Sequence, residues 1–341
     1  MPDSKVLITG ASGFIGWHLA QALIARGDEV ACLVRKTSNV DRLRPLGVRL
    51  VYGDVTDPAS LAPAVAAANV VYHVAGCIMA LRRRQYDEVN HQGTRNLLAA
   101  CAAQTTPPVL VAVSSMAAVG PAVDGRPRTE TDHPVQVSSY GRSKRAAELA
   151  AREFADRVPV TIVRPAMVMG EGDPVGIQLF RPIARFGIHV VRCRGRERQS
   201  VIHAADLAQL LIASAERGVR LKPDEEGPAA PIAGCYFSDC DEHPSYAELG
   251  RMVAVALGRR RVLVMPTPPR TLGGIAAFNL VISQIRRRPM YINFDRLGEL
   301  TAGSWLGSTE AARQQLGFSV DVSLAERLRQ TAEWYRQEGW V

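Results

Sequence analysis

The chain has 341 residues, of which 47% are hydrophobic and 22% charged, a composition that excludes intrinsic disorder and collagen-like repetition. At roughly 150 residues per domain, this length predicts about two domains or lobes. No run approaches the ~18 consecutive apolar residues of a membrane span, and the first residues lead into an apolar strand without a signal-peptide core. We therefore expect no integral membrane span and a cytoplasmic location.

The net charge of +8 and the spacing of the cysteines further limit the classes of protein to which the chain can belong. Only four of the 41 basic residues are lysines, and the arginines are scattered along the chain in short runs. A nucleic-acid binder usually concentrates charge on one element with aromatic residues interleaved, so we expect no nucleic-acid partner. The six cysteines form no C-x-x-C pair, which predicts free thiols and neither a disulfide framework nor a metal site.

The first half of the chain alternates short apolar runs with helical patterns. The apolar runs predict strands at Lys5–Thr9, Glu29–Val34, Val48–Tyr52, Val70–Val74, Val109–Val113 and Val160–Val163. The helical patterns cover Phe14–Arg26, Ser60–Ala68, Asn90–Ala103 and Ser139–Ala155. Strands that read as continuous apolar runs and alternate with helices predict an α/β fold with a doubly wound parallel sheet of the Rossmann type.

Beyond residue 165 the pattern is less regular. Helical patterns cover Asp206–Glu216, Tyr246–Leu257 and Leu324–Tyr335, while Gly170–Pro174 and Arg220–Gly234 are rich in glycine, proline and charge. We expect a dinucleotide-binding domain over residues 1–170, to which 201–237 return. Residues 171–200 and 238–341 are expected to form a smaller substrate lobe.

The first turn of the chain carries a glycine motif. Residues Thr9–Gly16 read T-G-A-S-G-F-I-G, which is G-x-x-G-x-x-G between a strand and a helix. Glycines allow a tight turn and a close approach of a pyrophosphate, whose charge then lies at the helix N-terminus. The motif predicts cofactor contacts from Gly10, Ser12, Gly13, Phe14, Ile15 and Gly16.

The end of the second strand bears on the choice of cofactor. An NAD site usually has an acidic residue there for the ribose hydroxyls, but Leu33–Ser38 contain none. Arg35 is able to pair with a 2′-phosphate, which favours NADP(H) and leaves NAD(H) open. Asp54 and Val55 follow the third strand, and the Asp54 carboxylate is free to accept from an adenine amino group.

Tyr140-x-x-x-Lys144 on a predicted helix provides a candidate acid–base pair. Residues four apart share a helix face, and a nearby ammonium lowers the pKa of a tyrosine from its usual value of about 10. Ser114 and Ser115 end a buried strand, at the sheet edge where parallel strands form a ligand crevice. Ser115 is positioned to hydrogen-bond a substrate oxygen, and capping of the strand end is the alternative role for one of the two serines.

These motifs together resemble the extended short-chain dehydrogenase/reductase family, also called the NAD-dependent epimerase/dehydratase family. The resemblance runs in order through the cofactor domain. Its motifs are Thr9–Gly16, Gly53–Asp54, His73–Gly76, Asn90–Asn96, Ser114–Ser115, Tyr140 with Lys144, and Arg164–Pro165.

The resemblance implies roles for the residues that match the family pattern. Tyr140 would be the acid–base, Ser115 would position the substrate oxygen, and Lys144 would bind the nicotinamide ribose and lower the tyrosine pKa. The Ala75–Gly76 backbone would lie over the cofactor and Pro165 near its carboxamide. Asn90 matches a position that supports a proton relay, or else it caps a helix. The helices Asn90–Ala103 and Ser139–Ala155 would pair in a homodimer.

The same catalytic set serves two kinds of reaction. Reductases exchange hydride with an external ketone or secondary alcohol, whereas epimerases and dehydratases return it to the same nucleotide sugar. Arg35 favours a reductase, as does the similarity of Ser114–Pro121 to the 3β-hydroxysteroid dehydrogenase branch, near the dihydroflavonol-reductase-like group. A third reading, a non-catalytic NAD(P)-binding regulator, is disfavoured by the complete Ser/Tyr/Lys set.

The C-terminal lobe offers two hints about a small-molecule substrate. The uncharged run Thr271–Ile285, with Leu272–Ile282 at its centre, would wall an apolar pocket, rest weakly on a membrane surface, or be an ordinary core or dimer helix. The arginines at 181, 185, 192, 194, 196 and 198 would instead clamp the diphosphate of a nucleotide sugar. His73 and His203 are interpreted as structural.

Overall fold

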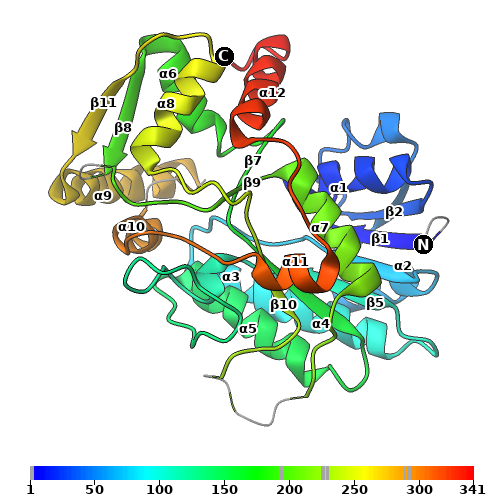
Figure 1. Cartoon of the computed structure of the whole chain (residues 1–341). Helices are drawn as coiled ribbons and strands as arrows, with labels where there is room; N and C mark the ends of the chain where they lie inside the picture. Colours follow the sequence, from blue (N-terminus) through cyan, green and yellow to red (C-terminus); the bar gives the residue numbers. More distant parts are fainter. Residues whose placement is uncertain (1–3, 193–194, 224–226, 228–229, 288, 291–292) are drawn as a thin grey trace.

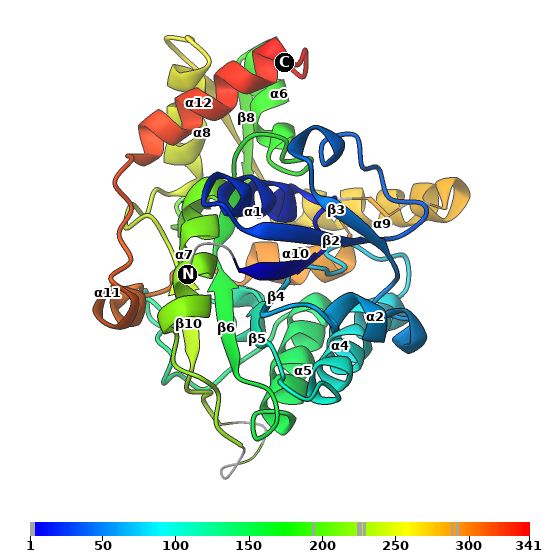
Figure 2. The same ribbon diagram turned by 90° about the vertical axis from the view of Figure 1, so that its right-hand side faces the viewer.

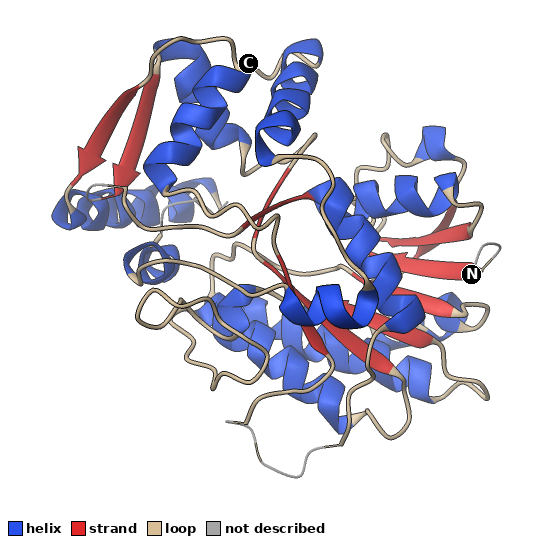
Figure 3. Ribbon diagram, in the orientation of Figure 1, coloured by secondary structure: helices blue, strands red, loops and turns tan. Residues whose placement is uncertain are grey.

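A parallel sheet of seven strands forms the centre of the computed structural model, which describes residues 4–192, 195–223, 227, 230–287, 289–290 and 293–341 (Figures 1 and 3). The strand order is β10-β6-β5-β4-β1-β2-β3. The strands are β1 (Lys5–Thr9), β2 (Glu29–Val34), β3 (Arg49–Tyr52), β4 (Val70–His73), β5 (Val109–Val113), β6 (Val160–Pro165) and β10 (Cys235–Ser238). The predicted doubly wound sheet is confirmed.

Helices cover both faces of this sheet because adjacent strand residues point in opposite directions (Figure 2). Ile8 faces a core shared with α1 (Phe14–Ala25) and α7 (Ala204–Arg217). Leu7 faces the opposite core, which is shared with α2 (Ala62–Val65), α4 (Gly93–Ala102) and α5 (Ser139–Glu153). Strand β1 is therefore buried on both sides, as its continuous apolar sequence predicts.

The helix predicted at Asn90 begins earlier than expected. A short helix, α3 (Arg83–Tyr86), continues through a π-helical segment (Asp87–Gln92) into α4 without a break. Asn90 therefore lies inside a helical stretch and does not cap one, which corrects that alternative.

A second, smaller core lies beyond the carboxyl edge of the sheet. It unites α6 (Ile177–Phe186), α8 (Tyr246–Ala256) and α12 (Leu324–Gln337) through Phe180, Leu249, Val253, Leu328 and Tyr335. Two parallel strand pairs accompany it: β7 (Met167–Met169) with β9 (Val201–His203), and β8 (Ile188–Arg192) with β11 (Leu263–Thr267). Helices α9 (Pro269–Arg286) and α10 (Phe294–Thr301) follow β11 in the chain.

Helix α11 (Glu310–Leu316) departs from the expected boundary between the two parts. Although residues 238–341 were expected to belong to the substrate lobe, Ala312, Leu316 and Phe318 pack into the core between the sheet and α7. The chain thus returns to the central sheet once more before it enters α12.

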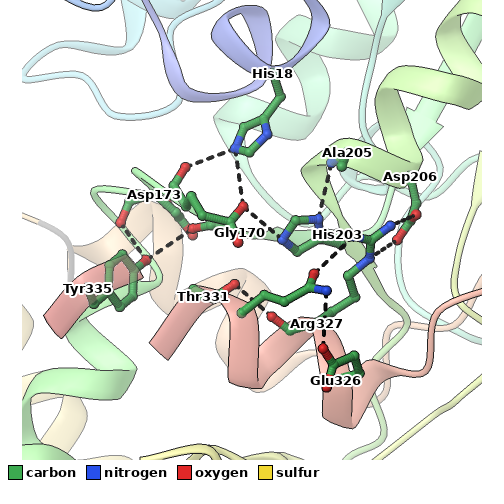
Figure 4. Close-up of polar contacts among 12 residues, drawn as sticks. His18, Gly170, Asp173, His203, Ala205, Asp206, Glu326, Arg327, Thr331 and Tyr335 are labelled. Atoms are coloured by element: carbon green, nitrogen blue, oxygen red, sulfur yellow. Dashed lines mark hydrogen bonds and ion pairs between the residues drawn. The ribbon is translucent and has the colours of Figure 1, made fainter. Parts of the chain in front are cut away.

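Histidine side chains organise the junction between α1 and α7 (Figure 4). Nδ1 of His203 accepts from the Ala205 N–H at 3.2 Å, so its Nε2 carries the proton and faces Glu171 Oε2 at 3.1 Å. His18 Nε2 donates to the Glu171 carbonyl at 2.9 Å. Burial lowers the pKa of His18 to about 4, which keeps it neutral. The structural role predicted for His203 is confirmed.

Helix α12 is fixed at both ends to the rest of the molecule. Near its start, Arg327 forms a two-point ion pair with Asp206 of α7 (Figure 4). Near its end, the Tyr335 hydroxyl donates to the Asp173 carbonyl at 3.1 Å. The guanidinium of Arg42, from the loop after β2, lies 5.1–5.6 Å from the rings of Trp17, Trp334 and Trp340. These contacts hold the C-terminus against the segment between β2 and β3.

No helix in the described part of the chain is long and apolar enough to cross a membrane. Cys32, Cys77, Cys101, Cys235 and Cys240 are free, as predicted. Cys193, Arg194 and Arg288 lie outside the described residues.

Candidate active site

The glycine loop presents backbone amides at the N-terminus of α1. Gly10 has φ +74°, and a Cβ there would lie 2.6 Å from the Ala75 nitrogen. A Cβ on Gly16 would lie 2.4 Å from the Gly10 carbonyl oxygen. Gly13 caps the helix without any side-chain hydrogen bond, and its neighbour Ser12 is exposed. The first-turn amides of α1, including those of Phe14 and Ile15, have no partner within the helix, so the loop fits the diphosphate of a dinucleotide.

A chain of hydrogen bonds fastens the end of β4 beneath this loop. The Ala75 N–H donates to Thr9 Oγ1 (3.2 Å), and that hydroxyl donates to His73 Nδ1 (2.7 Å). His73 Nε2 donates in turn to Thr94 Oγ1 (2.9 Å), which donates to the Asn90 carbonyl. Burial lowers the pKa of His73 to about 3, so the ring stays neutral and serves structure.

Asn90 ties the loop after β4 to the helix that carries Tyr140. Its Oδ1 accepts from the Cys77 N–H at 2.7 Å, and its Nδ2 donates to Ser143 Oγ at 2.9 Å. A Cβ on Gly76 would lie 3.3 Å from both Asn90 Oδ1 and Lys144 Nζ. The backbone at Gly76 thus passes close to Lys144, and Asn90 holds it there.

The residues predicted to contact adenosine lie at the ends of β2 and β3. Arg35 is exposed, and its charge lies near enough to oppose the effect of burial, which raises the pKa of the Cys77 thiol. Asp54 uses Oδ1 locally, accepting from the Thr56 N–H (2.9 Å) and hydroxyl (2.8 Å). Val55 is buried, and its carbonyl accepts from Asn96 Nδ2 at 2.9 Å. Arg35 therefore lies near enough to Cys77 for their charges to interact.

Ser115, Tyr140 and Lys144 come together at the carboxyl edge of the sheet. Tyr140 lies in the first turn of α5 and shares a hydrogen bond with the Ser115 hydroxyl. Ser115 Oγ also accepts from the Ala117 N–H at 3.1 Å, so this serine is both a cap and a neighbour of the tyrosine. Lys144 Nζ donates to the Val113 carbonyl at 2.7 Å, one turn below Tyr140.

The ionisation of these groups differs from the sequence prediction. Burial raises the pKa of Tyr140 to about 12, and the hydrogen bond from Ser115 only partly opposes it. Burial lowers the pKa of Lys144 to about 8, opposed by the charge of Glu148. Lys144 was predicted to lower the tyrosine pKa, but its ammonium is directed at the Val113 carbonyl and burial dominates. Tyr140 is consequently a neutral phenol at pH 7.

Ser114 belongs to a buried ionic network instead of the site. Its hydroxyl donates to Glu148 Oε1 at 2.6 Å. The same carboxylate accepts from Arg164 Nε at 2.8 Å and from Arg164 Nη2 at 2.9 Å. Pro165 follows Arg164 as the last residue of β6 and pairs with Ser238 of β10. The network fixes the ends of β5 and β6, where Ser115 and Pro165 lie.

Helix α10 supplies two acidic residues that sequence reasoning missed. The Asp295 carboxylate accepts from the backbone N–H groups of Ser139 (2.6 Å) and Tyr140 (3.2 Å). Glu299 Oε1 accepts from the hydroxyl of Ser138, the N-cap of α5, at 2.7 Å. A carboxylate at a helix N-terminus is stabilising. Nothing in the local sequence marks these residues, because their partners lie about 160 positions earlier.

This fold and this site define a class: Rossmann-type enzymes that use a nicotinamide cofactor and a tyrosine. A profile of the NAD dependent epimerase/dehydratase family matches residues 6–226, and the chain belongs to this family. It is an NAD(P)-dependent oxidoreductase of the extended short-chain dehydrogenase/reductase type.

Two curated relatives cover nearly the whole chain. A ceramide reductase from Caulobacter vibrioides is 30% identical over 341 residues, which is 98% of this chain and 96% of the relative. Mouse 3 beta-hydroxysteroid dehydrogenase type 7 is 27% identical over 362 residues, 98% of this chain and 96% of the relative. Among solved structures, a dTDP-glucose 4,6-dehydratase from Streptomyces venezuelae has the same fold (TM-score 0.76, 22% identity, 98% of each chain).

Proposed function

We propose that this chain is an NADPH-dependent reductase of an apolar ketone, reversible toward the secondary alcohol, with Tyr140 as the acid. The observation that carries the proposal is the hydrogen-bonded pair of Ser115 and Tyr140 beside Lys144, at the carboxyl edge of the sheet. A phenol whose pKa is raised to about 12 by burial is protonated at neutral pH, which is the form that donates to a ketone oxygen.

In this mechanism Ser115 and Tyr140 act on the substrate oxygen, and Lys144 acts on the cofactor. A bound reduced nicotinamide supplies the hydride that forms the new C–H bond at the carbonyl carbon. Ser115 donates a hydrogen bond to the carbonyl oxygen, and the Tyr140 hydroxyl gives that oxygen its proton. Lys144 would hold the nicotinamide ribose. In the oxidation direction Tyr140 takes the proton back as a base.

The cofactor preference rests on the end of β2. Leu33–Ser38 contain no carboxylate to accept from ribose hydroxyls, and the exposed guanidinium of Arg35 suits a 2′-phosphate. We therefore favour NADP(H) over NAD(H). The contacts proposed for Gly10, Asp54, Ala75 and Pro165 belong to the same cofactor site.

The substrate is proposed to be lipid-like instead of a nucleotide sugar. Ceramide and hydroxysteroids, named in the two relatives, are apolar molecules. Three arginines considered for a diphosphate clamp have partners within the chain: Arg181 donates to the Trp340 carbonyl, Arg198 to that of His243, and Arg192 pairs with Glu197. A sugar-nucleotide epimerase or dehydratase, favoured by the solved dehydratase of the same fold, is the second candidate.

The proposal extends to the domain organisation, the cellular location and the oligomeric state of the protein. Residues 1–170 with 201–237 would form the cofactor domain and most of the remainder the substrate lobe. A cytoplasmic homodimer would pair α4 and α5 with their copies, because the two helices lie side by side on one face of the sheet (Figure 2). Light scattering after gel filtration measures this state directly, and a monomeric mass would exclude it.

A substrate panel tests the reaction. Purified protein is incubated with NADPH or NADH against apolar ketones, hydroxysteroids and nucleotide sugars. Net oxidation of NADPH with an apolar ketone is the expected result. Conversion of a nucleotide sugar without net oxidation would establish the second candidate. Cofactor binding without any turnover across the panel would favour a non-catalytic regulator.

A further inference from the structure

Helix α9 exposes apolar side chains to solvent and buries polar ones, which is unusual for a helix on the surface of a protein. A helix on a soluble protein normally turns its apolar side inward and its polar side to water. Here Ser283 is buried and Asn279 is half-buried on the inner side, together with Leu272 and Ala276. The outer side carries apolar residues: Phe278 is 66% exposed, Val281 59% and Ile285 78%, with Ile275 beside them. A contiguous exposed apolar face marks an interaction surface.

The net charge of the chain falls within the sequence segment that contains this helix. Residues 249–294 contain eight arginines and no Asp, Glu or Lys, so this segment holds the whole net charge of +8 and the rest of the chain is formally neutral. Arg270 lies at the start of α9 and Arg286 at its end, and both are exposed. The apolar face therefore lies between cations, in a segment without a carboxylate that would be repelled by an anionic surface.

The neighbouring strands add to the same surface chemistry. Leu263 and Met265 of β11 and Val190 of β8 are exposed, and Met265 pairs with Val190 in register. Figure 1 places α9 at the periphery of the molecule, beyond the ends of β8 and β11 and away from the central sheet. The face is thus accessible to a large, extended partner.

We propose that α9 docks this protein on an anionic phospholipid bilayer, with Phe278, Val281 and Ile285 in the interface and the flanking arginines at lipid phosphates. An interfacial helix needs a wide apolar face together with cations that reach anionic headgroups, and α9 supplies both. The helix lies on the membrane and does not span it. The inference goes beyond the proposed reaction and does not depend on it.

The α9 face also connects to the candidate active site along the chain. Helix α10 follows α9, and its Asp295 and Glu299 bind the N-terminus of the helix that carries Tyr140. A bilayer under α9 therefore lies close, in sequence and in packing, to the helix N-terminus at Tyr140, where the proposed reaction would take place. Docking would shorten the aqueous path of such a molecule.

Flotation of the full chain with vesicles tests the proposal without any substrate or cofactor. We expect the protein to float with phosphatidylcholine vesicles containing phosphatidylserine, to float less as salt rises, and to stay unbound with phosphatidylcholine alone. Arg270→Gln with Arg286→Gln should weaken binding more than tenfold, since each arginine near an anionic surface contributes about fivefold. The matched control, Arg44→Gln with Arg49→Gln, removes two exposed charges elsewhere and should weaken binding less than about threefold.

A second pair of variants tests the apolar contact. Phe278→Ser with Ile285→Ser changes only exposed side chains, so folding should be retained while vesicle binding falls at least about tenfold. Val219→Ser, an exposed apolar residue elsewhere, should bind as the wild type does. Equal losses in α9 and control variants, or no binding to anionic vesicles, would overturn the proposal. So would a dimer that becomes monomeric in Phe278→Ser with Ile285→Ser, because the face would then belong to a second copy of the chain.

Discussion

Replacing Glu148 by glutamine should destabilise the protein strongly, because the carboxylate lies in a fully buried ionic network. Its side chain is 1% exposed, and it accepts from the 2% exposed Arg164 at 2.8 and 2.9 Å. A buried pair adds little net stability as a whole, but removal of one partner leaves an uncompensated charge and costs about 3–5 kcal/mol. Against a typical stability of about 5–15 kcal/mol, this is a large fraction.

Urea unfolding followed by circular dichroism measures the effect, with Glu153→Gln as the matched control. Glu153 lies on the same helix and pairs with Arg95, but its side chain is 55% exposed. The control should lose less than about 1 kcal/mol, as exposed pairs do. Equal losses for the two variants, or a loss below about 1 kcal/mol for Glu148→Gln, would refute the reasoning that burial sets the cost.

The same network predicts how the free energy of unfolding decreases at acid pH. Arg164 and its neighbours hold the pKa of Glu148 below its usual value, although burial acts in the opposite direction. A lowered pKa in the folded state contributes stability that is present above the unfolded value of about 4.3 and is lost as pH falls through the folded value. Glu148→Gln should therefore have a flatter loss of stability below about pH 4 than the wild type.

Three further changes have distinct expected results. Gly16→Ala should abolish cofactor binding measured by fluorescence, because a Cβ at this position would lie 2.4 Å from the Gly10 carbonyl oxygen. Gly273→Ala, where the added Cβ meets no atom within 4 Å, should bind the cofactor normally. Cofactor binding by both variants would contradict the packing argument. Asp295→Asn should lower kcat about tenfold, because it weakens the carboxylate cap at the N-terminus of the helix that carries Tyr140. The cofactor Kd should be unchanged, and Asp295→Glu should restore the activity. A change in the cofactor Kd without a change in kcat would contradict this role of Asp295. Arg35→Ala should raise the KM for NADPH more than that for NADH, and equal increases would remove the case for NADP(H).

Much of the fold was predictable because its strands are marked by short, continuous apolar runs in the sequence. Lys5–Thr9, Glu29–Val34 and Val109–Val113 have the predicted bounds, since continuous β-branched runs between turns fit only a strand buried on both faces. Strand β10 was missed because Cys235–Ser238 is short and joins the sheet only through β6. Helix α11 was not predicted, and its packing on the central sheet within the expected substrate lobe depends on tertiary contacts.

The candidate site also has some features that local sequence predicts and others that depend on tertiary contacts. The glycine loop and the spacing of Tyr140 and Lys144 are encoded by neighbours in sequence, and the structure brings Ser115 to them. The raised pKa of Tyr140 was not predictable, because it follows from burial that no local motif reveals. The contribution of Asp295 depends on a contact across 155 residues, which only the folded chain creates.

Tyr140→Phe tests the central claim most directly, with Tyr86→Phe as the control for an identical change on a ring 6.0 Å away. NADPH binding is followed by fluorescence and ketone reduction by NADPH oxidation. Loss of a general acid costs about 10²–10⁴-fold, so Tyr140→Phe should lose that much kcat while it binds NADPH as the wild type does. Tyr86→Phe should keep its activity within about threefold of the wild type. Turnover by Tyr140→Phe at the rate of the wild type would contradict the assignment of Tyr140 as the proton donor.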